Sequence, residues 1–140
     1  MLVMIDTNIL ISGIVLSSKY IRELISVVEK NHELILPDYI INEFKSTTRN
    51  KFPDKYYLAE SFLENFAFEI VYAPEISEEE KFPSIRDVKD LPILISSILY
   101  NADILITNDK DFRVLDITRP EILDPKEFLE KYNINEKKEQ

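Results

Sequence analysis

Four acidic residues occupy positions from which they could act together in one site. Asp6 directly follows the first apolar run of the chain, and Asp109 comes shortly after the fourth. Glu43 lies in the second turn of an expected helix, and Asp90 begins the apolar helix before the fourth run. Because the carboxyl ends of parallel strands meet at one sheet edge, we expect these acids to converge there. Crowded carboxylates need a cation between them, and their oxygens suit Mg²⁺ or Mn²⁺ better than zinc.

Each of these acids, taken alone, also has a structural explanation. Asp6 and Asp109 could be turn residues, Asp90 could be a helix N-cap, and Glu43 could be a solvated helix residue. The functional interpretation therefore rests on the set, in which an acid recurs at the same edge of successive structural units.

Apolar runs alternate with helical spacings along the chain, which predicts the elements that position the acids. This order favours one α/β domain with a central, mostly parallel sheet of about five strands flanked by helices. Residues 1–132 form the expected domain, and residues 133–140 form a charged tail that frays. Residues 73–89 are expected to be mainly irregular. The expected strands are residues 2–5, 33–36, 68–72, 103–107 and 121–123, and the helices are 19–29, 125–132 and three that begin at Asp38, Asp54 and Asp90.

The composition excludes several classes of protein. The 140 residues include no cysteine and one glycine, so disulfide scaffolds, cysteine nucleophiles and glycine-rich nucleotide loops are excluded. The single histidine, His32, lies in a polar stretch and is expected to be a solvated loop residue. No apolar run is long enough to span a membrane, and the first residues do not resemble a signal peptide. We therefore expect a cytoplasmic protein with no membrane contact.

The segments around the four acids resemble the four motifs of the PIN-domain family. In the first, a buried strand ends in Asp6-Thr7-Asn8, and in the last, Thr107, Asp109 and Asp111 follow a strand in the pattern Thr-x-Asp-x-Asp. The resemblance extends from residue 1 to about residue 130, with the motifs in the expected order. The four segments are Met4–Leu10, Pro37–Phe44, Asp90–Leu99 and Ala102–Phe112.

This resemblance implies a Mg²⁺- or Mn²⁺-dependent endoribonuclease, with relatives among the VapC-type toxins that pair with a small antitoxin. It implies that Asp6, Glu43, Asp90 and Asp109 are the catalytic metal ligands. Asn8 and Thr107 would orient these acids, and Asp111 would help to place a second cation. Asp87 is an alternative or additional ligand to Asp90. Leu94 and Ile95 depart from the small residues of the third motif, so packing of that helix could differ.

The net charge of −9 is unusual for a protein that binds nucleic acid. Solubilising surface glutamates explain most of it, and bound cations would reverse the charge of the acidic site. Basic residues near the motifs could contact an RNA backbone, although each could equally be an ordinary surface residue. These are Lys45, Arg49, Lys51, Lys89, Lys110 and Arg113.

Other functions fit the sequence less well. A phosphatase of the haloacid dehalogenase type needs a second aspartate where this chain has Asn8, and a 5′-nuclease relative usually needs a longer chain. A PIN-fold protein that processes or binds RNA with little or no catalysis remains the alternative. The aromatic and aliphatic residues Tyr20, Leu24, Tyr57 and Phe62 could also leave an exposed patch for a homodimer or an antitoxin.

Overall fold

Five parallel strands form the centre of the molecule in the computed structural model, which describes residues 1–72, 91–114 and 117–132. The strand order is β3-β2-β1-β4-β5, so the first strand lies in the middle and the chain crosses back over it after β3. The expectation of an α/β domain with about five strands is therefore confirmed, and every strand pairing is parallel. The strands are β1 (Leu2–Ile5), β2 (Glu33–Pro37), β3 (Glu69–Val71), β4 (Ile104–Ile106) and β5 (Glu121–Leu123).

The central strands are apolar on both faces because helices cover the sheet from two sides. Val3, Met4 and Ile5 in β1 are fully buried, as are Ile104, Leu105 and Ile106 in β4. A continuous apolar run is the usual pattern of a parallel strand in this position. These runs made the central strands predictable.

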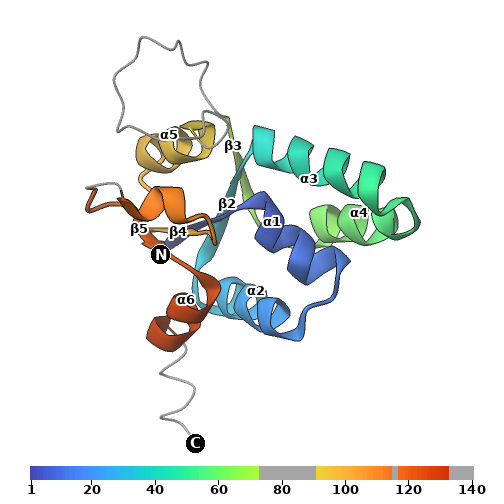
Figure 1. Ribbon diagram of the computed structural model, residues 1–140, viewed down its shortest axis with the longest axis horizontal. Helices are drawn as coiled ribbons and strands as arrows, with labels where there is room; N and C mark the ends of the chain where they lie inside the picture. Colours follow the sequence, from blue (N-terminus) through green and yellow to red (C-terminus); the bar gives the residue numbers. More distant parts are fainter. Residues whose placement is uncertain (73–90, 115–116, 133–140) are drawn as a thin grey trace, which may run out of the picture.

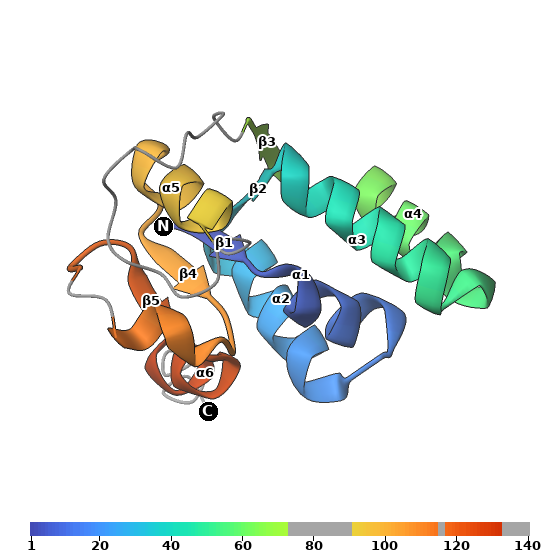
Figure 2. The same cartoon turned by 45° about the horizontal axis from the view of Figure 1, so that its top comes forward.

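The helices fall on opposite sides of the sheet. Helices α1 to α4 contact one another on one side, where α6 packs on α2, and α5 lies across the strands from α2 (Figures 1 and 2). The helical segments are α1 (Thr7–Leu10), the π-helix η1 (Ile11–Val15), α2 (Lys19–Asn31), α3 (Asp38–Lys51), the 3₁₀ helix η2 (Pro53–Lys55), α4 (Tyr56–Asn65), α5 (Leu91–Leu99), the 3₁₀ helix η4 (Lys110–Val114) and α6 (Pro125–Tyr132). In the described ranges, no helix is long and apolar enough to cross a membrane.

Two local predictions were wrong. The helix expected from Asp54 begins as a 3₁₀ turn, and α4 starts at Tyr56, with the side chain of Tyr57 65% exposed. His32 is only partly exposed, because the rings of Phe128 and Tyr132 on α6 pack against it at centroid distances of 5.7 and 5.6 Å.

The four side chains considered for a partner surface divide evenly. Tyr20 and Tyr57 are exposed, whereas Leu24 and Phe62 belong to the core. The irregular stretch 73–89, the tail 133–140 and the residue Asp90 lie outside the described residues.

Candidate active site

Asp6 lies at the carboxyl end of the central strand, where β1 gives way to α1. Its backbone N–H donates to the carbonyl of Ile106 in β4 at 3.0 Å, which continues the sheet pairing by one residue. Its carboxylate caps α1, because Oδ1 accepts a hydrogen bond from the N–H of Thr7 at 2.8 Å. An aspartate at this position satisfies an N–H group that the helix leaves without a partner.

Thr107 connects Asp6 to the second acidic strand end. Its buried hydroxyl donates to Oδ2 of Asp6 at 2.9 Å and accepts from the N–H of Asp109 at 3.0 Å. Asp109 in turn accepts from the N–H of Asp111 through Oδ1, at 2.9 Å, where η4 begins. A continuous series of hydrogen bonds thus orients two of the expected acids at neighbouring strand ends.

Glu43 enters the same site from α3. Helix α3 starts directly after β2 and buries the face that contains Ile40, Phe44 and Thr48, so the adjacent Glu43 is exposed. Its charge nevertheless acts on Asp6, as described next. A helix that leaves the carboxyl end of the neighbouring strand therefore brings a third acid towards the same edge.

The surroundings of Asp6 disfavour its negative charge. Burial raises the pKa of the Asp6 carboxyl, and the charges of Glu43 and Asp109 raise it further, whereas the hydrogen bonds from Thr107 and Thr7 oppose this shift. The net pKa lies above the ordinary value for aspartate. Asp6, Glu43 and Asp109 therefore form one electrostatically coupled group, and positive charge placed among them would relieve their repulsion.

The chemistry of this donor set fits a hard divalent cation. The charges of two further carboxylates, Glu43 and Asp109, act on Asp6, and carboxylate oxygens are ligands that suit Mg²⁺ and Mn²⁺. Within the described residues, however, no three potential ligand side chains lie close enough to form a complete metal site by themselves. Asp87 and Asp90, the two acids considered for the third motif, fall outside those residues.

Of the two residues expected to orient the acids, Thr107 contacts Asp6 and Asn8 is exposed to solvent. The hydrogen bond from Thr107 is the contact that an orienting role requires, whereas Asn8 lies in α1. Thr7 was not singled out from the sequence, although its N–H holds Asp6. The signal for it was an aspartate directly before a helix start, where the following N–H groups need an acceptor.

The basic residues considered for RNA contacts differ in their positions relative to the acidic site. Lys45 lies two positions after Glu43, about 200° around α3, so it faces away from the acid. Arg49 donates through Nη2 to the hydroxyl of Tyr56 at 2.8 Å, and Lys110 is exposed at the start of η4. Lys51 is exposed at the end of α3, whereas Lys89 and the side chain of Arg113 lie outside the described part.

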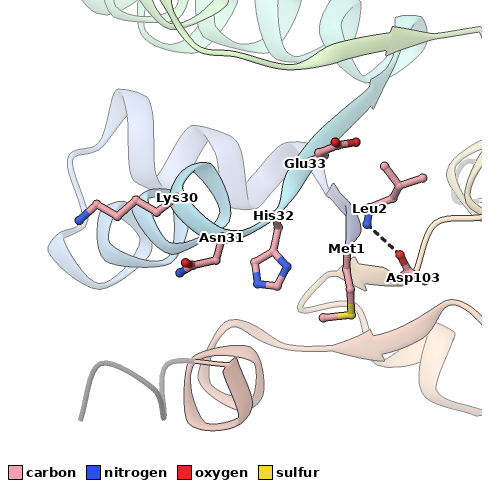
Figure 3. A pocket seen from close by; sticks show the side chains of 7 residues that line it. All are labelled: Met1, Leu2, Lys30, Asn31, His32, Glu33 and Asp103. Atoms are coloured by element: carbon pink, nitrogen blue, oxygen red, sulfur yellow. Dashed lines mark hydrogen bonds between the residues drawn. The ribbon is translucent and has the colours of Figure 1, made fainter. Parts of the chain in front are cut away.

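A hollow at the opposite edge of the sheet has a different character. It has a volume of about 360 Å³ and is lined by the start of β1, the end of α2 and Asp103 (Figure 3). Asp103 accepts from the N–H of Leu2 at 2.8 Å and pairs with Arg119 at 2.7 Å. These contacts fasten the amino ends of two strands, so the role of Asp103 is structural.

Comparisons with known proteins identify the family and the fold. A family model described as a PIN domain matches residues 2–111, and the chain therefore belongs to the PIN-domain family. Its fold is similar to that of a chain in VapBC2 from Rickettsia felis, solved bound to a DNA fragment from their promoter. That match has a TM-score of 0.65 and 19% identity and covers 89% of this chain and 98% of the other.

A second similar structure is VapBC-1 from nontypeable Haemophilus influenzae. It matches with a TM-score of 0.60 and 22% identity over 90% of this chain and 99% of the other. At these identities the two structures establish a shared fold. No curated protein sequence gives a significant match.

Proposed function

We propose that this PIN-domain protein is a Mg²⁺- or Mn²⁺-dependent endoribonuclease that hydrolyses RNA phosphodiesters. The observation that carries the proposal is the partly buried carboxylate of Asp6, which accepts hydrogen bonds from Thr7 and Thr107 and is acted on by the charges of Glu43 and Asp109. Maintaining such mutually repelling acids at a sheet edge costs free energy, and a cation-dependent reaction gives a reason for that cost.

The protein groups would act as ligands and as positioning groups. Asp6, Glu43 and Asp109, with Asp90 or Asp87, would hold the ion, and Thr107 would keep the Asp6 carboxylate in one orientation. Each oxygen of Asp6 accepts one hydrogen bond, so lone pairs remain for a cation. When bound, the cation supplies activation of a water molecule and neutralises charge on the scissile phosphate.

Asp111 and Asn8 have subordinate roles in this proposal. Asp111 lies in the first turn of η4, where its N–H donates to Asp109, and it would help to place a second cation. Asn8 would orient the acids when a cation and substrate are present.

A cleavage assay on a structured RNA tests the proposal. We expect cleavage with Mn²⁺ or Mg²⁺, no cleavage in EDTA, and loss of cleavage in the Asp6→Asn protein. Glu64→Gln removes one negative charge from the exposed surface of α4 and should cleave normally. Cleavage that persists in EDTA, or in Asp6→Asn, would contradict the proposal.

The third ligand can be assigned in the same assay. We propose Asp90, because it directly precedes α5, and expect Asp90→Asn to lose metal-dependent cleavage. Loss in Asp87→Asn with normal cleavage by Asp90→Asn would assign the role to Asp87 instead.

We further propose that the protein is the toxin of a toxin–antitoxin pair and binds a small antitoxin. Both similar structures come from VapBC complexes, and Leu16 and Tyr20 leave apolar surface exposed beside the start of α2. A small partner that copurifies with the chain should inhibit RNA cleavage. Copurification without inhibition would favour a PIN-fold RNA-processing role. We also propose that the chain forms a homodimer, and light scattering that shows a monomer at all concentrations would rule this out.

A further inference from the structure

Positive charge gathers at the far end of the α3–α4 hairpin although the chain as a whole is strongly acidic. Residues 44–59 include Lys45, Arg49, Lys51 and Lys55 but a single acid, Asp54, in a chain with a net charge of −9. Arg49, Lys51 and Lys55 are all exposed where α3 ends and η2 begins. Such a separation of charge produces a local positive potential that a net charge conceals.

Arg49 is held in a fixed orientation at this end of the hairpin. Its guanidinium carbon lies 4.6 Å from the ring centroid of Tyr56, and its Nη2 donates to the hydroxyl of the same residue at 2.8 Å. Stacking and one hydrogen bond reduce the freedom that a long side chain loses on binding. The planar group retains further N–H donors that suit a phosphate.

The same surface presents an aromatic ring to solvent. Tyr57 is 65% exposed on the first turn of α4, next to Tyr56. Proteins that bind single-stranded nucleic acid combine cations that follow the backbone with aromatic rings on which bases stack. An acidic protein segment would use the cations but would have no bases to stack on Tyr57.

The hairpin places this surface at a defined distance from the acidic site. The α3–α4 turn projects away from the sheet in both views (Figures 1 and 2). Lys51 follows Glu43 by eight positions in α3, which is about 12 Å along the helix axis. A stacked strand rises about 3.4 Å per nucleotide, so roughly four nucleotides cover this distance.

We infer that the hairpin tip, defined as Arg49, Lys51, Lys55, Tyr56 and Tyr57, is a second binding surface for single-stranded RNA. The inference rests on the proposed ribonuclease function and adds a substrate surface outside the acidic site. The cations bind backbone phosphates, and Tyr57 stacks on a base several nucleotides from the cleavage position. This surface gives an acidic protein a means of attracting RNA.

Fluorescence anisotropy with a labelled twelve-nucleotide single-stranded RNA, in EDTA and at several salt concentrations, tests the inference. The triple variant Arg49→Gln, Lys51→Gln, Lys55→Gln should bind at least ten times more weakly. The slope of log affinity against log salt concentration should become shallower by about two, since each lost phosphate contact removes about 0.7 from it for single strands. Melting curves should show that the variant remains folded.

A matched variant controls for net charge. Lys19→Gln, Lys30→Gln, Lys126→Gln removes the same three charges from exposed positions on α2 and α6, and it should change affinity less than twofold. Tyr57→Ala should weaken binding about fivefold or more through lost stacking, with an unchanged salt dependence.

Three outcomes would overturn the inference: equal losses in the two triple variants, unchanged binding by the hairpin-tip variant, or competition by polyglutamate as effective as that by unlabelled RNA. The last would identify a surface for an acidic protein. If the hairpin-tip triple variant binds RNA and cleaves it with Mn²⁺ as well as the unmodified protein does, the inference is refuted while the proposed ribonuclease function stands. If RNA binding depends on the hairpin tip but no metal-dependent cleavage occurs, the binding surface stands and the proposed ribonuclease function is refuted.

Discussion

The carboxylate of Asp6 combines two opposing demands at the scale of a single residue. As the N-cap of α1 and the acceptor of the Thr107 hydroxyl, it contributes hydrogen bonds that stabilise the fold. As a partly buried anion that the charges of Glu43 and Asp109 repel, it destabilises the fold, and its raised pKa indicates that this second effect is larger. A residue selected only for stability would not carry that charge.

Replacing Asp6 by asparagine should therefore separate stability from activity. A folded-state pKa above the unfolded value means that the ionised carboxylate costs folding free energy at neutral pH. We expect Asp6→Asn to melt at a higher temperature than the unmodified protein in EDTA, while metal-dependent RNA cleavage is lost. The control, Glu64→Gln, should change neither quantity. A lower melting temperature for Asp6→Asn would mean that the capping role outweighs the repulsion.

The elements that hold the site differ in how far the sequence determines them. Strands β1 and β4 could be predicted, because runs buried on both faces are apolar throughout. From these strand ends followed the expected proximity of Asp6 and Asp109. The double use of the Thr107 hydroxyl could not be predicted from spacing, because it depends on the angle at which the chain leaves β4.

The prediction for His32 was wrong for a tertiary reason, whereas the segment directly after Asp6 was not assigned to any element. His32 has polar neighbours in the sequence, but α6 returns from the far end of the chain and places two aromatic rings on it. The segment that follows Asp6 forms α1 and a π-helix, with the N–H of Leu16 donating to the carbonyl of Ile11 at 3.0 Å. Its apolar residues fit a helix or a loop equally well, so local pattern did not decide between them.

Gly13 in that π-helix should resist substitution although alanine favours helices. A Cβ built on Gly13 would lie 2.7 Å from Cγ2 of Ile21 and 2.9 Å from Cδ1 of Ile25, so α2 would have to shift. Overpacking of this kind typically costs about 1–3 kcal/mol. We expect Gly13→Ala to lower the free energy of unfolding in urea, whereas Ser12→Ala in the same segment changes it little. Equal stability of the two variants would mean that α2 accommodates the extra methyl group.

The packing of α6 on His32 should make stability depend on pH. Burial lowers the pKa of His32, with a further contribution from the amino group of Met1. Its Nδ1 is buried and has no hydrogen-bond partner among the described residues. A lowered folded-state pKa means that the stabilisation of the fold by neutral His32 is complete above about pH 6.5. It is lost as the pH falls from there through the folded-state value. The melting temperature should therefore decrease between pH 7.5 and 5.5.

The chain offers a direct control for this titration, because His32 is its single histidine. His32→Gln removes the titrating group and should flatten the pH dependence in that range, even though the lost ring contacts lower the melting temperature overall. An unchanged slope in His32→Gln would show that His32 does not cause the effect. The carboxyl of Asp6 could not cause it either, because its raised pKa predicts stability that increases as the pH falls.

At the scale of the whole molecule, charge and fold are arranged around the two edges of the sheet. The carboxyl edge gathers Asp6, Glu43 and Asp109, whereas contacts such as that between Leu2 and Asp103 close the amino edge. A protein with a net charge of −9 repels RNA unless cations neutralise part of it. A divalent ion at the carboxyl edge would relieve the repulsion that Glu43 and Asp109 exert on Asp6, so cation binding should be coupled to folding as well as to substrate binding.

That coupling can be measured without any substrate. An ion that binds only the folded state stabilises it by about 2.7 kcal/mol when its concentration is a hundred times the dissociation constant. For a domain of this size, such a gain corresponds to a rise of several degrees in melting temperature. We expect Mn²⁺ to produce this rise in the unmodified protein and in Glu64→Gln, but not in Asp6→Asn. A shift of the same size in Asp6→Asn would place the ion elsewhere on the acidic surface. Superimposable curves with and without Mn²⁺ for the unmodified protein would leave the crowding of its carboxylates without a functional explanation.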